Sequence, residues 1–431
     1  MLVNFRFGNH RSFYEETTFS MEATTDKDLI GLNTFSVDEN LFNKNENTLL
    51  KSAVVFGGNA SGKTNLIKAI AYMRNVVLGS GGQEPIVKMC EKFAFFTDAA
   101  TEDSMFEVTF IEQGVLYTYG FSIGDGQITE EWLFRKKERL TPVFSRKAGR
   151  LKIAGTPNNI QQFINVQPTA LLVSIGSNFN LPIKDSLGAV YGWFQKLLIV
   201  YGNMTNSLEI YTVNNEKYRK EALKILQRAD IGISDMKVKK DRVVSNMHNI
   251  DEVLRFNTQL QTQLHGQLKQ EENSLYDIDL RTTFDVYDKD GNVAKKKEVM
   301  LFKDRGFHSE GTERLVMYLG WLLAALDQGR VLFVDEIDSK LHFLMSDYLI
   351  GLFNSIDSNP HNAQLICTAH AVMLMDESLR RDQIYFVSKD TKGQSHLCAL
   401  SDYKNVRKTD LFSKKYLAGF YSKLPDLNQG E

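Results

Sequence analysis

The alternation of apolar and polar residues divides the amino-terminal part of the chain into strands and one clear helix. The first dozen residues alternate and Ser52–Phe56 form a short apolar run, so both stretches are predicted strands. A glycine-rich turn follows the second strand. Apolar residues then recur at helical spacing, which predicts a helix from Lys63 to about Val77.

After this helix the pattern changes to strands separated by turns. The predicted strands are Phe106–Glu112, Leu116–Ile123 and Ile128–Phe134, and Gly124-Asp125-Gly126 is typical of a hairpin turn. We therefore expect an antiparallel subdomain inserted after the first helix.

The carboxyl-terminal part alternates between helices and strands. A helix is predicted from about Glu313 to Asp327, and a second helix follows the buried strand Val331–Val334. Further strands are predicted at Gln364–Thr368 and Gln383–Val387. Strands alternating with helices at both ends of the chain imply an α/β fold in which both termini contribute to one parallel core sheet.

The middle of the chain is predicted to be a mainly helical or mixed insertion. Tyr191–Leu198 and Lys217–Ala229 have helical patterns, whereas Phe284–Tyr287 and Val293–Met300 form a predicted hairpin. Leucines at helical spacing in Val244–Glu272 fit a short coiled-coil arm and, equally well, an exposed helix docked along one face. The predicted organisation is residues 1–150 and 301–431 as two halves of one domain, with 151–300 inserted between them.

Composition excludes several classes of protein. The chain has 431 residues, of which 43% are hydrophobic and 24% charged, and such values exclude a disordered or low-complexity chain. Its formal net charge of -2 provides no general attraction to nucleic acid or to anionic lipid. The three cysteines form no C-x-x-C pair, and Arg6 and Arg11 interrupt the apolar amino terminus. We therefore expect a cytoplasmic protein without a membrane segment.

The strongest chemical signal is the glycine-rich turn. Residues 57–64, GGNASGKT, match the G-x-x-x-x-G-K-[ST] pattern and lie between a predicted strand and a predicted helix. In such a loop, backbone N–H groups surround a phosphate, the lysine reaches the β- and γ-phosphates, and the threonine hydroxyl ligates Mg²⁺. The candidate nucleotide ligands are Gly57, Asn59, Gly62, Lys63, Thr64 and Asn65.

A pair of acids follows the apolar strand Val331–Val334. Asp335 and Glu336 stand where a Walker B strand delivers its acidic residues. Asp335 is expected to hold Mg²⁺, together with Thr64, and Glu336 is expected to polarise the attacking water.

Three further features distinguish among phosphate-loop proteins. Ser309 and Gly311 lie at the start of a predicted helix, where a hydroxyl and an N–H group can bind a γ-phosphate across a dimer. Asp338 stands in the loop that would cross that interface. His370 follows a predicted strand, where its imidazole can sense the γ-phosphate.

The order of these motifs resembles a known group of ATPases. The segments GGNASGKTN, SEGTER, VLFVDEID and CTAH are similar to those of ABC-type ATPases related to SMC, RecF and OLD proteins. The chain more closely resembles the AAA family ATPases of prokaryotic phage-defence modules, of the RloA-like and PARIS types. The segments NHRSF, LRRDQIYFVSKD and YLAGFYSKLPD also fit that resemblance, which covers about residues 1–135 and 300–427.

The resemblance implies an ABC-type head that binds ATP and Mg²⁺. It assigns nucleotide roles to Lys63, Thr64, Asp335, Glu336 and His370, and it places Ser309 and Gly311 on the ATP of a partner protomer. His308 and Ser422 depart from the usual residues, which are glutamate and glycine. The glutamine that usually ligates Mg²⁺ stays open among Gln83, Gln113 and Gln127.

A cluster of basic residues raises the question of DNA contact. Several phosphates of a duplex could be neutralised by such a cluster, but a solvated hairpin face is the commoner explanation. The cluster comprises Arg135, Lys136, Lys137, Arg139, Arg146, Lys147, Arg150 and Lys152, and smaller groups are Lys237, Lys239, Lys240 and Arg242 and then Lys295–Lys297.

The leading functional hypothesis is a Mg²⁺-dependent ATPase that forms a dimer, or a higher homo-oligomer, around ATP. We expect it to act as a sensor or scaffold for a separate effector, which the resemblance implies is a nuclease used in antiviral defence. The alternatives are a RecF- or SMC-like DNA-repair clamp and an interaction protein that binds ATP with negligible turnover. A transporter ATPase fits the motifs but not the long segment between Thr64 and Ser309.

Overall fold

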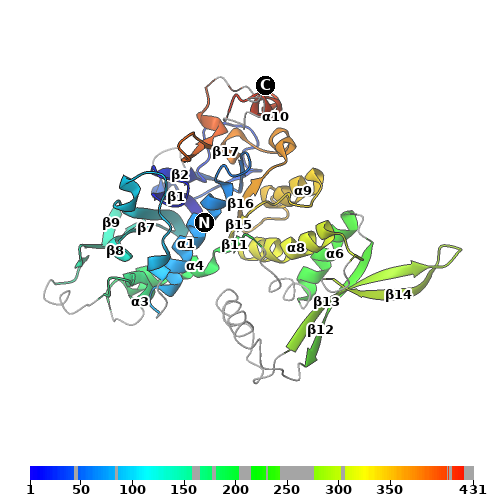
Figure 1. The fold of residues 1–431 in the computed structure, drawn as a ribbon. Helices are drawn as coiled ribbons and strands as arrows, with labels where there is room; N and C mark the ends of the chain where they lie inside the picture. Colours follow the sequence, from blue (N-terminus) through cyan, green and yellow to red (C-terminus); the bar gives the residue numbers. More distant parts are fainter. Residues whose placement is uncertain are drawn as a thin grey trace. The chain divides into compact units, whose positions relative to one another are not determined.

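The computed structural model describes residues 1–42, 47–82, 86–157, 166–176, 181–202, 215–229, 232–242, 276–301, 306–404, 406 and 410–421 (Figure 1). The chain divides into two compact units. Unit 1 comprises Met1–Tyr201, Gly329–Ile337 and Ser346–Glu431, and unit 2 comprises Gly202–Gln328 and Asp338–Met345.

A mainly parallel sheet forms the centre of unit 1, as the alternating pattern predicted. Its neighbouring strands are parallel except at the edge formed by the last two, which pair antiparallel. In order the strands are β11 (Leu198–Val200), β15 (Val331–Val334), β16 (Gln364–Ala369), β5 (Ser52–Phe56), β17 (Ile384–Lys389) and β18 (Ser395–Ala399). In Figure 1, β16, β15 and β11 lie side by side. Every residue of these three strands and of β5 is buried, which explains their continuous apolar sequences.

A seven-stranded antiparallel sheet forms the second part of unit 1. It contains β1 and β2, which precede the first helix, so the predicted subdomain is not purely an insertion after that helix. Asp125 and Gly126 have φ angles of 49° and 69°, which allow the tight turn predicted between the second and third inserted strands. In order the strands are β10 (Arg150–Ile153), β9 (Leu140–Lys147), β8 (Gln127–Lys136), β7 (Val115–Gly124), β6 (Ser104–Glu112), β1 (Leu2–Gly8) and β2 (Thr17–Ser20).

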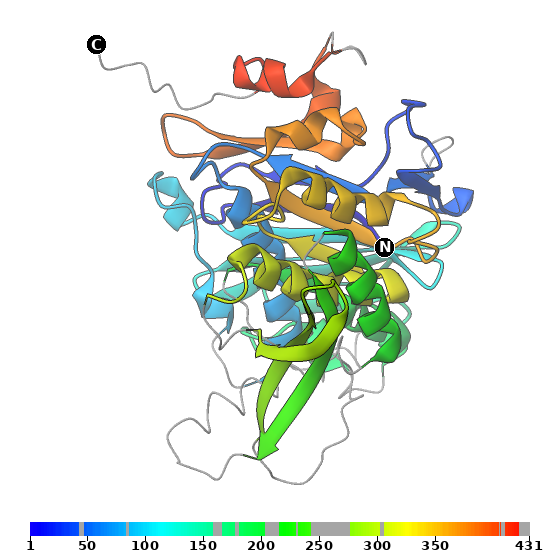
Figure 2. The same ribbon diagram turned by 90° about the vertical axis from the view of Figure 1, so that its right-hand side faces the viewer.

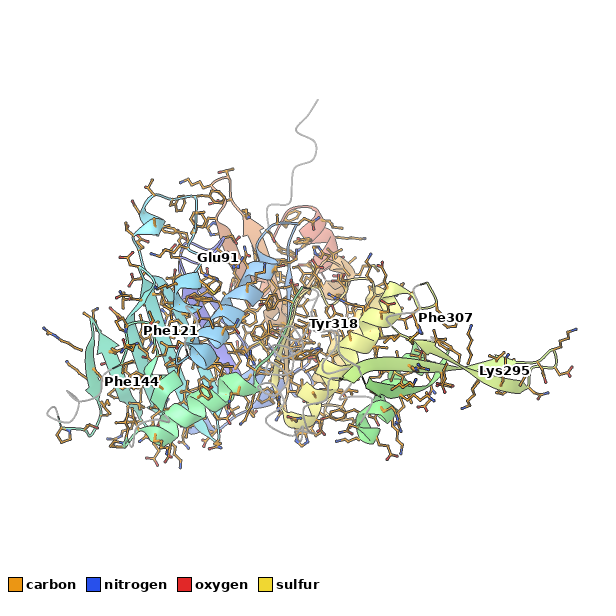
Figure 3. All side chains as sticks on the ribbon, turned by 60° about the horizontal axis from the view of Figure 1, so that its bottom comes forward. Glu91, Phe121, Phe144, Lys295, Phe307 and Tyr318 are labelled. Carbon is orange, nitrogen blue, oxygen red and sulfur yellow. The ribbon has the colours of Figure 1, made fainter. Side chains whose placement is uncertain are left out.

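One hydrophobic core joins this antiparallel sheet to the helices of unit 1. Phe121 and Phe144, labelled in Figure 3, are buried on β7 and β9, and Phe110 stacks on Trp193 of α4 with their ring centroids 4.4 Å apart. Among the described residues, the helices that lie wholly in unit 1 are α1 (Lys63–Gly79), α3 (Leu172–Ile175), α4 (Lys184–Lys196) and α10 (Phe412–Leu417). The chain also forms a small sheet of β3 (Thr34–Ser36) and β4 (Thr48–Leu50).

The boundary predicted for the insertion differs from the observed one. Residues 151–201 belong to unit 1, and α4 ends at Lys196, whereas the pattern predicted a helix as far as Leu198. Leu197 takes an extended backbone with ψ of 123°, and β11 then pairs with β15. Tertiary pairing thus overrides the local helical pattern at this point.

Unit 2 contains more strand than the expected helical insertion. Its described residues form the antiparallel sheet β12 (Ile233–Arg242), β13 (Tyr276–Tyr287) and β14 (Val293–Met300), shown in Figure 2, and the helices α6 (Glu216–Arg228) and α8 (Glu310–Gln328). The described part of residues 202–301 is therefore mixed rather than mainly helical, and it contains the predicted hairpin of β13 and β14. The stretch Val244–Glu272, proposed as an arm, lies outside the described residues. Helix α9 (Phe343–Asn354) begins in unit 2 and continues into unit 1.

Helix length and composition bear on membrane insertion. Across the described ranges, no helix combines the length and the apolar character needed to span a bilayer.

Candidate nucleotide-binding site

The phosphate loop connects β5 to α1, as the sequence predicts. Ala60 and Gly62 have φ angles of 59° and 121°, so the loop turns through the left-handed region just before α1. A Cβ atom at Gly57 would lie 2.4 Å from the carbonyl oxygen of Val387, and that distance leaves space only for glycine. The loop backbone is therefore held closely against β17.

Lys63 lies over this loop with only 6% of its surface exposed. Its Nζ donates to the carbonyl oxygens of Gly57, at 2.8 Å, and Gly58, at 3.1 Å. The ammonium is thus placed at the loop, where the β- and γ-phosphates of a nucleotide would bind.

The phosphate loop is also held by hydrogen bonds from serine side chains outside it, which were not predicted from the sequence. Ser395 of β18 donates its hydroxyl to Ser61 O at 2.5 Å, and its Oγ is also hydrogen-bonded with Ser12 Oγ at 2.8 Å. Asn65 donates its side-chain amide to Ser12 Oγ at 2.8 Å, so this candidate ligand also braces the loop. The NHRSF segment and β18 together fix the position of the loop.

Asp335 and Glu336 follow β15 directly. Asp335 is 7% exposed, and its Oδ1 accepts a hydrogen bond from Thr368 Oγ1 at 2.7 Å. The same hydroxyl oxygen accepts the backbone N–H of Glu336 at 2.7 Å. Glu336 has a φ of 53°, a conformation that is rare for a glutamate and typical of residues held in place at functional sites. Sequence reasoning missed Thr368, although it lies in the CTAH segment.

His370 lies beside Glu336. Its Nε2 is 3.6 Å from Glu336 Oε1, and the two side chains are 42% and 46% exposed. Parallel pairing explains the proximity, because Val334 is opposite Cys367 and Ala369 is opposite Phe56. The phosphate loop, the acid pair and the histidine therefore lie at the carboxyl ends of three adjacent strands, where α/β sheets place their ligands.

Ser309 and Gly311 belong to unit 2, whereas the other candidate residues belong to unit 1. Ser309 Oγ accepts the N–H of Thr312 at 3.1 Å and so caps α8. A Cβ atom at Gly311 would lie 2.5 Å from the carbonyl oxygen of Lys340, so the loop after Asp338 contacts the first turn of α8 closely. Lys340 also pairs with Glu310 at 2.9 Å.

The residues present fit a magnesium ion held jointly with a nucleotide. In the described part of the chain, no three His, Cys, Asp or Glu side chains cluster as a metal site. Magnesium commonly uses one or two protein oxygens and completes its shell with water and phosphate, and Thr64 and Asp335 could supply those oxygens. Gln83 lies outside the described residues, Gln113 lies in the turn after β6, and Gln127 begins β8.

The LRRDQ segment has a structural role that the sequence did not reveal. Arg380 is 1% exposed and donates to both oxygens of Asp382 at 2.9 and 2.7 Å. Gln383 Oε1 accepts the amide of Asn33 at 2.6 Å, and its Nε2 donates to Ser52 O at 2.9 Å. These contacts fix the amino end of β5, the strand that leads to the phosphate loop.

One member of the predicted basic cluster is unavailable for DNA contact. Arg146 is 4% exposed and pairs with the fully buried Glu131 at 3.1 Å. Burial raises the pKa of Glu131, and the charge of Arg146 opposes that rise. Its neighbour Lys147 remains exposed and pairs with Glu130 at 2.5 Å. The expectation of a cationic role on the surface is therefore wrong for Arg146.

A protein-family model covers the whole site in unit 1. The family described as "AAA domain, putative AbiEii toxin, Type IV TA system" matches residues 52–376. The chain belongs to this family. Membership in this AAA-domain family indicates an ATP-hydrolysing phosphate-loop protein that binds nucleotide, usually with a divalent metal. A comparison with curated proteins finds no match.

Proposed function

We propose that this AAA-domain protein is a Mg²⁺-dependent ATPase with an ABC-type head that dimerises around two ATP molecules. In this proposal, its nucleotide state controls a separately encoded effector in antiviral defence. The observation that carries the catalytic part is the pairing of Glu336 with His370 at the sheet edge that also presents the phosphate loop.

Hydrolysis follows from the roles that the geometry favours. Glu336 accepts a hydrogen bond from water and orients it for in-line attack on the γ-phosphate. Lys63 and the loop N–H groups stabilise negative charge on the phosphates, and bound Mg²⁺ adds further neutralisation there. His370 is proposed to respond to the presence of the γ-phosphate, and its closeness to Glu336 supports this role. Thr368 holds Asp335 and the backbone of Glu336 in one arrangement.

The dimer is proposed from the start of α8. Ser309 caps a helix of 19 residues and Gly311 lies in its first turn, and the amino end of a helix favours anions through its N–H groups and dipole. Acting on the ATP of a second protomer, these residues would make closure of the dimer depend on the γ-phosphate.

The defence context rests on the family and on the resemblance to phage-defence ATPases. The family description names an AbiEii toxin and a Type IV TA system, which supports an abortive-infection or toxin–antitoxin setting. The likeness of the SEGTER, CTAH and LRRDQ segments to RloA-like and PARIS-type ATPases supports the finer proposal that the effector is a nuclease.

The catalytic assignment is tested by Lys63→Ala. We expect this change to abolish ATP turnover and phage defence together, because the ammonium at the loop is lost. Lys68→Ala, also on α1, is the matched control and should keep both activities. Unchanged ATP hydrolysis in the Lys63→Ala variant would contradict the assignment of the phosphate loop as the ATP-binding site.

A DNA clamp is the second candidate, favoured by the cations that remain exposed near the β8–β9 hairpin. Arg135, Lys137, Arg139, Arg150 and Lys152 are exposed. Duplex binding by the isolated protein that weakens steeply with salt would support this function. Binding that is unaffected when these five residues are changed to glutamine would exclude this surface.

A further inference from the structure

Lys51 lies buried at the opposite end of β5 from the phosphate loop. Its residue surface is 2% exposed. Its backbone N–H donates to Asn33 O at 2.9 Å, and its carbonyl oxygen accepts Leu365 N at 2.9 Å. The backbone of Lys51 is thus fixed between the small sheet region and β16.

The ammonium of Lys51 has little compensation from protein groups. Within the described ranges, its Nζ makes one hydrogen bond, to Asn354 O at 3.4 Å, and no ion pair. Burial lowers the pKa of Lys51. An ammonium carries three N–H donors, and a buried charge without a counter-ion is costly. These properties are typical of a group that binds an anion.

Lys51 also lines a cavity of about 390 Å³ in unit 1. The cavity wall includes the hydroxyl-bearing residues Thr34 and Thr48. Ile30 and Ile356 line it too, and they are 59% and 57% exposed. The cavity wall therefore includes a lysine with little exposed surface next to accessible aliphatic side chains, around a volume that fits a small ligand.

We propose that this cavity is a binding site for a small aliphatic monocarboxylate. The carboxylate pairs with the ammonium of Lys51, and the hydrocarbon part contacts Ile30 and Ile356. An uncharged ligand would leave the buried ammonium without a counter-ion, and a phosphate dianion would gain nothing from the aliphatic surface. A monocarboxylate with a short hydrocarbon chain therefore fits the cavity better than either of these two ligands.

Calorimetric titration of the full chain tests this site with butanoate, its uncharged analogue butanamide and inorganic phosphate. We expect butanoate to bind more tightly than butanamide by about tenfold or more, since a charge-assisted pair replaces a neutral contact. Lys51→Met should remove this preference and should fold, because it deletes a poorly compensated buried charge. Lys152→Met, at an exposed lysine of β10, should keep it.

A second variant tests the aliphatic wall without altering the lysine. Ile356→Ser should reduce the gain in affinity from acetate to hexanoate, while the preference for carboxylate over amide persists. Equal binding of butanoate and butanamide, or a preference that survives in Lys51→Met, would overturn the site. If phosphate binds as tightly as butanoate, the proposal is also overturned, because the cavity then holds an adventitious ion only.

Discussion

Thr368 holds the two acidic residues at the end of β15 with one hydroxyl group. It donates to Asp335 and accepts the N–H of Glu336, which has a left-handed backbone. In the proposed mechanism, these contacts keep the Mg²⁺-binding carboxylate of Asp335 and the water-orienting carboxylate of Glu336 in a fixed relation. The proposed catalytic geometry therefore depends on Thr368, a residue that is assigned no contact with metal or substrate.

Thr368→Val keeps the shape of the side chain but removes both hydrogen bonds. We expect turnover and apparent Mg²⁺ affinity to fall by about 10–100-fold, as is typical for groups that orient a metal ligand. Thr109→Val is the matched control, because the Thr109 hydroxyl bonds Thr118 within the antiparallel sheet, away from the candidate site. Steady-state ATPase assays over a range of Mg²⁺ concentrations measure the turnover and the apparent Mg²⁺ affinity of each variant. Equal losses in the two variants would point to general destabilisation.

His10 makes stability depend on pH. It is 2% exposed, stacks on Tyr72 with ring centroids 5.4 Å apart, and burial lowers its pKa to about 3 from the ordinary 6.5. Below pH 6.5 the His10 imidazole binds a proton in the unfolded chain but stays neutral in the folded chain. The free energy of unfolding therefore falls as the pH falls.

When the pH is lowered from 7.5 to 5.5, the free energy of unfolding of the wild type should fall by about 1.4 kcal/mol more than that of a variant without this imidazole. Urea unfolding of wild type and His10→Leu at both pH values measures the difference. Parallel losses in the two proteins would show that His10 is not the group responsible.

At the scale of elements, sequence patterns predicted the pieces that depend on local periodicity. The strand Val331–Val334 and the helix beginning at Lys63 have the predicted starts, and the predicted parallel sheet is present. The patterns failed where distant pairing decides the structure. β11 forms because Leu198–Val200 pairs with β15, and no local signal reports that partner.

The same distinction applies to the candidate site. The phosphate loop, the acid pair and His370 follow from motifs, because their chemistry needs fixed residue types. Ser395, Thr368 and the buried partner of Arg146 could not be found from the sequence, since their roles arise only from contacts made in the folded chain.

Two adjacent arginines provide a test of the element that supports β5. Arg380 is fully buried against Asp382, whereas the Arg381 side chain is 36% exposed and pairs with Asp26 at 2.6 Å. Arg380→Met should lower the free energy of unfolding by about 3–5 kcal/mol, because Asp382 keeps its charge without its counter-ion. Arg381→Met should cost about 1 kcal/mol or less. Chemical denaturation measures both, and similar costs would contradict the assigned network.

At the scale of the whole molecule, the candidate residues are divided between two units. Unit 1 holds the phosphate loop, Asp335, Glu336 and His370, and unit 2 holds Ser309 and Gly311. In the proposed dimer, Ser309 and Gly311 of one protomer contact the ATP held by unit 1 of the other, so that association would depend on the γ-phosphate. That dependence is the physical basis of the proposed switch.

Native mass spectrometry of the Glu336→Gln variant, with and without MgATP and in the presence of the proteins encoded beside it, tests the central claim most directly. Because this change should block hydrolysis while keeping ATP bound, we expect a dimer or larger homo-oligomer that retains two or more ATP and captures a second protein. Lys63→Ala should stay monomeric under the same conditions. A Glu336→Gln protein whose mass and partners are the same with and without ATP would contradict the account.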